Sequence, residues 1–179
     1  ETVIIKRDGV EIGTATVTGT NWELTDTLAS DGKYTYTAIV RNDVGSESQP
    51  SNNYEISLDT VAPTQTVQIV NYYDDIGVSQ GDFGTNTTTD DRNPLLKGTI
   101  NTDLGVGENV AIYQTIAGVT TMIGLATVAA DKTWSFNVDS GLADDKSYTF
   151  AARVMDQAGN TGPKSNDFNI NINLTVNVN

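Results

Sequence analysis

The segment Tyr148-Thr149-Phe150-Ala151-Ala152 decides the fold of this chain, because a closely similar segment, Tyr34-Thr35-Tyr36-Thr37-Ala38, precedes it. In each copy aromatic residues alternate with smaller side chains, so both aromatics are expected on one face of a β-strand. Flanking matches, such as Trp22 with Trp134, extend the correspondence along the chain. The spacing between the copies exceeds the ~20–50 residues of solenoid repeats, so each copy can hold its own core. The sequence therefore predicts a tandem array of small domains.

Short β-strands are expected throughout the second copy, and helix signals are almost absent. Thr, Val, Ile and Tyr alternate with polar residues in short runs that Gly, Asn and Asp interrupt. The expected strands lie near Thr66–Tyr72, Leu95–Ile100, Asn109–Ile116, Met122–Val128, Thr133–Val138, Ser147–Met155 and Asp167–Val176. Seven short strands in about a hundred residues are typical of an immunoglobulin-like β-sandwich. We predict an all-β fold in which tandem immunoglobulin-like β-sandwich domains form a linear array.

Four aromatic residues have predicted places in this fold. Tyr148 stands at the start of the penultimate strand, where such sandwiches often carry a tyrosine corner. Trp22 and Trp134 are expected to be core anchors, because buried aromatics dominate small β cores. Tyr72 is expected to pack inward.

The first copy is shorter than the second. Residues 1–59 align only with the later part of the second copy, so nothing corresponds to residues 64–107. We expect residues 1–59 to be the C-terminal part of an incomplete domain that lacks two of seven strands and exposes an interior edge. Residues 60–64 are expected to be a short, stiff linker containing one proline, and residues 65–179 a complete domain. On this view the sequence begins inside a domain.

The composition excludes several classes of function. The chain has no histidine and no cysteine, which removes Ser-His-Asp and Cys-His catalysis, Cys/His zinc sites and disulfides. Its formal net charge of −13 should repel nucleic acids and anionic membrane surfaces and favour metal cations. The longest apolar runs are only a few residues, so neither a membrane-spanning helix nor a signal peptide is expected. Adjacent carboxylates in extended loops diverge, whereas a glycosidase needs two acids across a cleft, so no enzyme activity is expected.

A long acidic segment follows the first strand of the second copy. It runs for roughly twenty residues, well beyond the median of about 4–6 for a loop, and Arg92 is its single base. Its acids are Asp74, Asp75, Asp82, Asp90 and Asp91. Crowded carboxylates repel one another unless a cation lies between them, and oxygen-only ligands select Ca²⁺ before Mg²⁺. The alternative is that Asp and Asn are ordinary turn formers in a solvated loop.

Other oxygen ligands are expected to converge on the same junction between domains. Asp59 precedes the linker, and the loop Asn42–Asp43 of the first copy is expected at that end of its sandwich, while its counterpart, Asp156–Asn160, would face a following domain. Neither an EF-hand loop nor a glycine-rich calcium nonapeptide is present. The predicted Ca²⁺ ligands are Asp59, Asp74, Asp75, Asp90, Asp91, Asn42, Asp43, Asp156 and Asn160.

These motifs resemble the bacterial Ig-like (BIg) repeats of giant surface adhesins exported by type I secretion, such as the giant non-fimbrial adhesin of Salmonella. The matching residues are Asp74-Asp75-x-Gly77, Thr89-Asp90-Asp91-x-x-Pro94-x-Leu96-x-Gly98-Thr99, Trp134-Ser135-Phe136, Asp156-x-Ala158-Gly159-Asn160 and the linker Asp59-Thr60-Val61-Ala62-Pro63. The first copy departs from the pattern at Asn42-Asp43-Val44-Gly45-Ser46, where the usual form is Asp-x-x-Gly-Asn. The resemblance implies interdomain Ca²⁺, an extracellular location and a stalk role.

The sequence therefore favours a structural stalk segment of a large bacterial surface adhesin, on the cell surface or secreted. Interdomain calcium would rigidify its repeats, which would support attachment to host cells or surfaces and so virulence. The expected partners are neighbouring repeats, with no nucleic acid and no membrane insertion; a host receptor or glycan, bound through another part of the protein, is left open. The alternative is an accessory or carbohydrate-binding module of a secreted enzyme, which would need a row of exposed aromatics. Tyr72 and Tyr73 are the only candidates.

Overall fold

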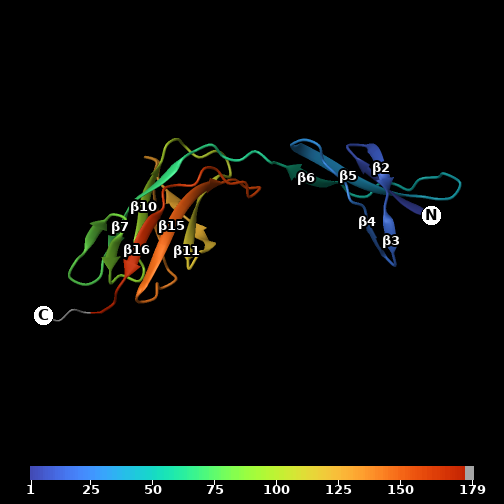
Figure 1. Ribbon diagram of the computed structural model, residues 1–179. Coiled ribbons are helices and arrows are strands. Elements are labelled where there is room, and N and C mark those ends of the chain that lie inside the picture. Colours follow the sequence, from blue (N-terminus) through green and yellow to red (C-terminus); the bar gives the residue numbers. More distant parts are fainter. Residues whose placement is uncertain (176–179) are drawn as a thin grey trace. The chain divides into compact units, whose positions relative to one another are not determined.

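The computed structural model describes residues 1–175 and divides the chain into two compact units, Glu1–Thr60 and Val61–Asn179 (Figure 1). Every regular element in the described residues is a β-strand, so the predicted all-β fold is confirmed. The last expected strand, Asp167–Val176, ends at Val176, which lies outside the described residues. Each unit is described by itself below.

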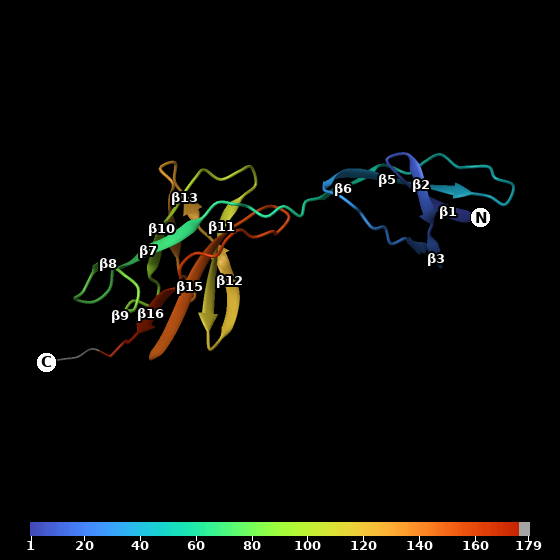
Figure 2. The ribbon, with the colours of Figure 1, turned by 45° about the horizontal axis from the view of Figure 1, so that its top comes forward.

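The second unit is a β-sandwich of two five-stranded sheets with strand orders β13-β14-β10-β7-β8 and β12-β11-β15-β16-β9. All neighbouring strands are antiparallel except β9 and β16, which are parallel. Figure 2 shows the two layers. The strands are β7 Val67–Asp74, β8 Gly81–Phe83, β9 Thr87–Thr89, β10 Leu95–Ile100, β11 Asn109–Ile116, β12 Val119–Leu125, β13 Thr127–Val128, β14 Thr133–Asn137, β15 Lys146–Met155 and β16 Phe168–Ile172.

Alternation of apolar residues builds the core between these sheets. In β7 every second residue from Val67 to Ile69 is buried, and the alternation resumes at Tyr72 after an irregularity in the β7–β10 register. Tyr72, Leu96 and Phe150 are fully buried, which confirms that Tyr72 packs inward. Burial of each large apolar side chain contributes roughly 1.5–3 kcal/mol, so the pattern along the strands is what holds the sheets together.

The tyrosine corner is present in both units. In the second unit the buried Tyr148 hydroxyl accepts a hydrogen bond from the Ala143 backbone N–H at 2.7 Å. In the first unit Tyr34 occupies the same place, and its hydroxyl donates to the Ser30 carbonyl at 2.6 Å. In both cases the start of a ten-residue strand, β15 or β5 (Gly32–Arg41), is tied to the loop before it.

Two details of the strand prediction are wrong. The expected strand Met122–Val128 is two strands, because the chain leaves β12 in one sheet and enters β13 in the other. The long segment after β7 is not a single loop, because it contains β8 and β9, one added to each sheet. Short strands of two or three residues give too few alternations to be recognised in a sequence.

The first unit has one four-stranded sheet, of order β2-β1-β5-β6, and a separate two-stranded ribbon, β3-β4. Its further strands are β1 Thr2–Arg7, β2 Val10–Thr14, β3 Thr16–Thr18, β4 Asn21–Glu23 and β6 Tyr54–Leu58. In sequence, β1 to β6 correspond to β11 to β16, and no described strand of the first unit corresponds to β7 to β10. The prediction that Trp22 is a core anchor is wrong, since its side chain is 50% exposed. Trp134 is 2% exposed, as predicted.

Gly98 on β10 allows the close packing around Trp134. A Cβ at Gly98 would lie 2.1 Å from the Gln68 carbonyl oxygen and 2.2 Å from the Trp134 ring. The Trp134 Nε1–H donates to the Thr99 carbonyl at 3.2 Å, which fixes the indole over this strand.

We therefore expect Gly98→Ala to destabilise the second unit by more than about 2 kcal/mol, because overpacking a closed core costs about 1–3 kcal/mol and backbone cannot give way. Thermal unfolding of the full chain measures this. Gly84→Ala is the matched control, since a Cβ at Gly84 meets nothing within 4 Å. Equal melting temperatures for the two variants would contradict the packing argument.

Candidate functional site

The acidic segment lies at one end of the second unit, where β7 ends and β10 begins. These strands are antiparallel neighbours with Tyr73 paired to Leu95, so Asp74–Asp75 and Asp90–Asp91 are brought to the same edge. Two of the four carboxylates, those of Asp74 and Asp91, are buried at 2% and 3% exposure, and the other two are exposed. The structure therefore gathers these four predicted residues at one end of the sandwich.

Thr89 links the two buried carboxylates. Its hydroxyl donates to Asp74 Oδ2 and accepts a hydrogen bond from the Asp91 backbone N–H at 2.9 Å. Asp74 Oδ1 also accepts from the Ile76 N–H at 2.9 Å. The bonds from the Ile76 and Asp91 N–H groups each span two residues, as in Asx and ST turns, whereas the Thr89–Asp74 bond joins β9 to β7. Thr89 was missed as a site residue, although the spacing Thr89-x-Asp91 is a local signal for such a turn.

Burial raises the pKa of Asp91 above its ordinary range, and the nearby negative charges of Asp74 and Asp75 raise it further. Hydrogen bonds to the Asp91 carboxylate oppose this shift, from the Asn93 N–H at 2.7 Å and from the Asp75 backbone. Within residues 1–175 none of the four carboxylates forms an ion pair with a basic side chain. Ionisation of Asp91 is therefore unfavourable in the folded protein, and a bound cation would offset this cost in free energy.

Asp75, Asp90 and Asp91 line one hollow of about 380 Å³, together with Arg92, Asn93 and Asn137. Arg92, the expected counter-charge, instead donates to the Leu142 carbonyl at 2.8 Å. Asp74 and Asp90 line a second hollow with Asn173 and Thr175. Both hollows contain carboxylate, amide or hydroxyl oxygens, which are the donor types that Ca²⁺ accepts.

Gly77 lets the Asp90 carboxylate approach the turn after β7. Its φ is +68°, and a Cβ there would lie 2.3 Å from Asp90 Oδ2. A side chain at this position would therefore displace Asp90 as well as strain the backbone. In the described part of the chain no group of three or more His, Cys, Asp or Glu side chains is close enough to hold a metal ion. A bound cation would thus draw on carbonyl, amide or water oxygens beside these carboxylates.

The first unit separates two of the predicted ligand sets. Gly32 at the start of β5 pairs with Leu58, the residue before Asp59, whereas Asn42 and Asp43 follow the far end of β5. Ten residues of strand span roughly 33 Å, so the expectation that Asn42–Asp43 lie at the Asp59 end of the sandwich is wrong.

The second unit also reverses the expected placement of its loops. β7 carries the chain away from residues 61–63, so the acidic segment lies at the opposite end of the unit from the linker side. The loop Asp156–Asn160 follows β15 at the linker side, where a Cβ at Gly162 would lie 2.6 Å from the Pro63 carbonyl oxygen. The prediction that the acidic segment lies beside the linker is wrong. The two are close in sequence, but β7 carries the chain from one end of the sandwich to the other.

The Asp156 carboxylate is already bound within its own loop. Its oxygens accept from the backbone N–H and the side-chain amide of Asn160, both at 2.9 Å, and these bonds lower the pKa of Asp156. In the first unit the counterpart Asn42 accepts from the Ser46 N–H at 2.8 Å. The two loops therefore share a closed geometry, and only the second carries a carboxylate at its first position.

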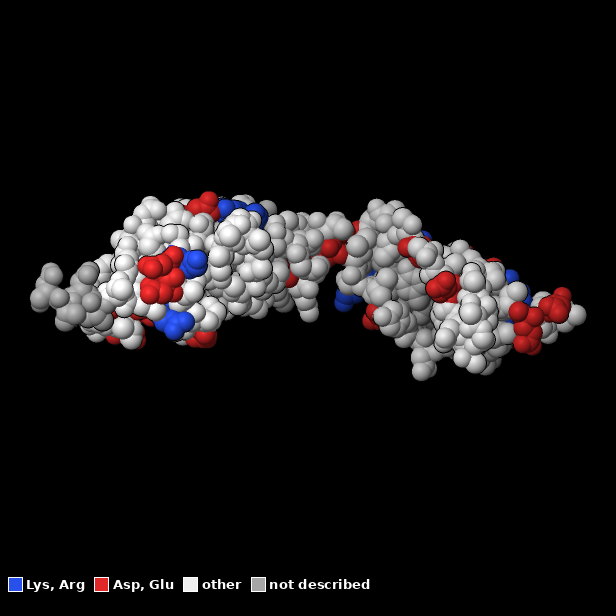
Figure 3. All heavy atoms as spheres, turned by 60° about the horizontal axis from the view of Figure 1, so that its bottom comes forward, with Lys and Arg blue, Asp and Glu red and all other residues white. Residues whose placement is uncertain are grey.

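Two other surface features bear on function. Acidic side chains are spread over both units on the face in Figure 3. Tyr73, the candidate for a sugar-binding aromatic, has the Lys97 ammonium 4.6 Å from its ring centre, and Lys97 also bonds Asp82 at 2.7 Å. The described residues include no helix able to cross a membrane.

An immunoglobulin-like sandwich preceded by a related half-unit, with a pair of buried carboxylates at one end, defines this protein as a β-sandwich repeat protein. The sequence model of the bacterial Ig-like domain matches residues 62–173, more than half of the chain. The chain therefore belongs to the bacterial Ig-like domain family.

One solved structure with a similar chain is described as "Structural insight into host cell surface retention of a 1.5-MDa bacterial ice-binding adhesin". The two chains are 16% identical with a TM-score of 0.35, and the match covers 97% of this chain. This chain spans about half of the solved one (53%). No curated protein sequence matches.

Proposed function

We propose that this chain is a stalk segment of a large bacterial surface adhesin, located on the cell surface or secreted, and that calcium at the ends of its Ig-like repeats makes the stalk stiff. Membership of the bacterial Ig-like domain family supports the repeat architecture. The sequence resemblance to type I-secreted adhesins supports the location. The partners would be neighbouring repeats, and attachment to host cells or surfaces would use another part of the protein. No enzyme activity is part of this function.

The observation that carries the calcium proposal is the pair of buried carboxylates, Asp74 and Asp91, which have no basic partner in residues 1–175. Burial of an ionised carboxylate without an opposite charge is costly. A hard divalent cation bound beside them would balance two negative charges, with Asp75 and Asp90 nearby at the same end of the unit. Ca²⁺ is favoured over Mg²⁺ because it accepts irregular sets of six to eight oxygens, whereas Mg²⁺ demands a near-ideal octahedron.

The position of the site at the end of the sandwich suggests how an ion would stiffen a stalk. An ion bound there would order the segment Asp74–Asp91, and with it the surface that meets the next repeat. The Asp156–Asn160 loop lies at the other end of the same unit and would supply oxygens toward a preceding repeat. Asp59, Asn42 and Asp43 stay in the proposal as separate candidate ligands, since the first unit places them at its two ends.

The alternative, an accessory or carbohydrate-binding module of a secreted enzyme, lacks a comparable observation. Such a module needs stacked aromatic faces open to a sugar ring. Tyr72 is buried, and one face of Tyr73 is covered by Lys97. The exposed Trp22 and Tyr54 of the first unit are counterparts of the core residues Trp134 and Phe168, so their exposure does not by itself indicate a sugar platform. We therefore favour the stalk.

The proposal predicts that calcium stabilises the folded protein. Extracellular calcium modules bind with Kd of ~10⁻⁴–10⁻³ M, and a ligand at about 100 times its Kd adds about 2.7 kcal/mol to stability. Calcium at roughly 10 mM should therefore raise the melting temperature of the second unit by about 10 °C over chelated protein. Scanning calorimetry in calcium, magnesium and EGTA makes the measurement. Identical melting curves in calcium and EGTA would refute calcium binding, and an equal response to magnesium would refute the choice of ion.

A further inference from the structure

The second unit has one long strand at the edge of a sheet. β12 ends the sheet of order β12-β11-β15-β16-β9, so β11 is its only neighbour among the described strands (Figure 2). The other edge strands of this unit, β8, β9 and β13, have two or three residues, whereas β12 has seven. An edge strand offers backbone N–H and C=O groups to another strand, and proteins often prevent this by keeping edge strands short. β12 lacks that protection.

β12 also lacks the charges and prolines that commonly protect an edge strand. Its sequence is Val119-Thr120-Thr121-Met122-Ile123-Gly124-Leu125, in a chain of net charge −13. Three of its apolar side chains are exposed, namely Val119, Met122 and Leu125. A long, uncharged edge strand with exposed apolar side chains is suited to pairing with a further strand.

The counterpart of β12 in the first unit is β2, and the two strands have the same register. Glu11 of β2 pairs with Lys6, as Met122 of β12 pairs with Tyr113, and a register irregularity precedes each of these pairs. Glu11 and Met122 therefore occupy equivalent positions. The strand that carries the charge is also the shorter, with five residues.

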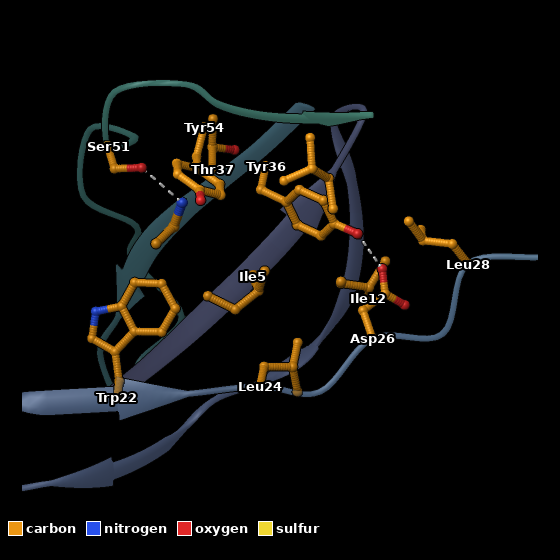
Figure 4. A pocket seen from close by; sticks show the side chains of 12 residues that line it. Ile5, Ile12, Trp22, Leu24, Asp26, Leu28, Tyr36, Thr37, Ser51 and Tyr54 are labelled. Atoms are coloured by element: carbon orange, nitrogen blue, oxygen red, sulfur yellow. Dashed lines mark hydrogen bonds between the residues drawn. The ribbon is translucent and has the colours of Figure 1, made fainter. Parts of the chain in front are cut away.

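Glu11 and Met122 both point to the outer side of their sheets, because the next residue points inward. Figure 4 shows Ile12 on the open inner face of the first unit, where it lines a hollow of about 510 Å³. Its counterpart Ile123 packs against the core of the second unit. The outer sides of the two units can therefore be compared residue by residue.

An ion-pair network lies on the outer side of the first unit at this edge. Arg41 Nη2 donates to Glu11 Oε2 at 2.6 Å and to Glu47 Oε1 at 2.7 Å. Arg41 and Glu47 also form an isolated β-bridge, which recurs in the second unit between Met155 and Thr161. The second unit therefore has uncharged residues at each of these positions, and its edge is open to a partner that the first unit's charges would disfavour.

The core holds β12 in place behind its open edge. A Cβ at Gly124 would lie 2.6 Å from the Phe136 ring, so the strand lies close against the opposite sheet. Because β12 is already ordered, pairing with another strand would cost little additional conformational entropy.

The hairpin before β12 determines which backbone groups face the open edge. Ala117 and Gly118, both with positive φ, form the two-residue turn between β11 and β12. The closing pair of such a hairpin is hydrogen-bonded, and bonded pairs then alternate with non-bonded ones. The backbone N–H and C=O groups of Thr120 and Met122 therefore point away from β11.

We propose that β12 pairs antiparallel with β12 of a second copy of this chain, which joins two sheets across a two-fold axis. Thr121 would face its own copy, and Thr120 of each chain would exchange backbone hydrogen bonds with Met122 of the other. The second copy is the occupant that the charges favour, because two strongly acidic chains can meet at β12 without like charges opposite each other. This homotypic contact goes beyond the stalk function and does not rest on calcium.

The first test is sedimentation of the full chain in EGTA over micromolar to millimolar concentrations. We expect the weight-average mass of the wild type to rise toward that of a dimer. Met122→Glu, which introduces the residue found at this position in β2, should remain monomeric. Val106→Glu is the matched control, because it adds the same charge at a fully exposed loop position of the same unit and should dimerise as the wild type does.

The second test uses the absence of cysteine, because a single introduced thiol can only cross-link two copies. Thr121→Cys should form a disulfide-linked dimer under mild oxidation, since the two thiols would face each other at a non-hydrogen-bonded pair, where the strands lie closest. Its neighbour Thr120→Cys, and Val10→Cys at the equivalent position of β2, should cross-link much more slowly.

Self-pairing through β12 is overturned if the wild type stays monomeric over the whole concentration range, or if the three cysteine variants cross-link at equal rates. It is also overturned if Met122→Glu dimerises as strongly as the wild type, because another surface, such as the open inner face of the first unit, would then hold the dimer. All measurements are made in EGTA, so a negative result leaves the calcium proposal untouched.

Discussion

Trp134→Ala is expected to destabilise the second unit by about 3–5 kcal/mol, whereas Trp22→Ala should cost the first unit only about 1 kcal/mol. Removing a fully buried tryptophan loses its transfer free energy and leaves a cavity, and losses of this size are typical. Trp134 also loses its hydrogen bond to the Thr99 carbonyl. Trp22 is half exposed, so its removal loses only part of the transfer term and opens no closed cavity.

Urea unfolding of the full chain, followed by NMR signals assigned to each unit, separates the two costs. Trp134→Phe serves as a graded control, because it keeps a ring in the core but removes the indole N–H. We expect it to cost less than Trp134→Ala and more than Trp22→Ala. Equal losses for the two tryptophan-to-alanine variants would mean that Trp22 is buried in solution, and that the open face of the first unit is covered.

The core of the second unit could be predicted from its sequence because half-buried antiparallel strands carry an alternating pattern. Tyr148 and Phe150 on one face, and the bounds of β10 and β11, follow directly from that alternation. The strands β8 and β9 could not be recognised this way. β9 is fixed by its parallel pairing with β16 and by bonds such as the Asn86 N–H to the Asn169 carbonyl at 2.7 Å, which join residues far apart in sequence.

The internal repeat correctly predicted which residues of the two units correspond, but not how deeply those residues are buried. Trp22 matches Trp134 in sequence, yet Trp134 is buried beside β10, and the described residues of the first unit contain no counterpart of β10. The same limit applies to the candidate metal ligands. The acids could be identified from composition and spacing, but which end of a sandwich they occupy depends on strand direction. The structure therefore separates Asp43 from Asp59, and the acidic segment from the linker side.

Within the acidic segment, the sequence could not distinguish the roles of the four carboxylates. Asp74 and Asp91 are buried and joined through Thr89, whereas Asp75 and Asp90 are exposed. The distinction comes from the burial alternation at the end of β7, which buries Asp74, and from the turn after β9, where the Asp91 N–H bonds back to Thr89. Burial and the neighbouring negative charges also raise the pKa of Asp91, so its ionised form is disfavoured in the folded protein without a cation.

Asp91→Asn is expected to have opposite effects on stability in the absence and presence of calcium. Its raised pKa means that the folded state binds the proton more tightly than the unfolded state. Without calcium, stability should therefore fall as the pH rises above the unfolded carboxyl value of about 3.9, until Asp91 is ionised in both states. The asparagine variant lacks this loss, so at neutral pH in EGTA it should melt above the wild type.

In calcium the order should reverse, because a neutral amide balances a divalent charge less well than a carboxylate. The wild type should gain the stabilisation of the bound ion, about 2.7 kcal/mol at 100 times its Kd. The variant should lose most of this stabilisation. Melting curves at neutral pH with EGTA and with 10 mM calcium, roughly 100 times the lower Kd bound, measure both orders. Asp82→Asn is the control, since Asp82 is exposed, lies in the same segment and bonds only Lys97 among the basic side chains of residues 1–175.

A crossing of the melting temperatures for Asp91→Asn, with none for Asp82→Asn, is the signature of a cation held by the buried pair. If Asp91→Asn melts higher than the wild type in both solutions, the carboxylate is merely unfavourable and no ion compensates it. If it melts lower in both, its hydrogen bonds to the Asn93 and Asp75 backbones outweigh its charge, and these residues are turn formers. Either result would remove the basis for calcium in the proposed stalk, because the carboxylates at the end of the second unit would then have no ion to share with a neighbouring repeat.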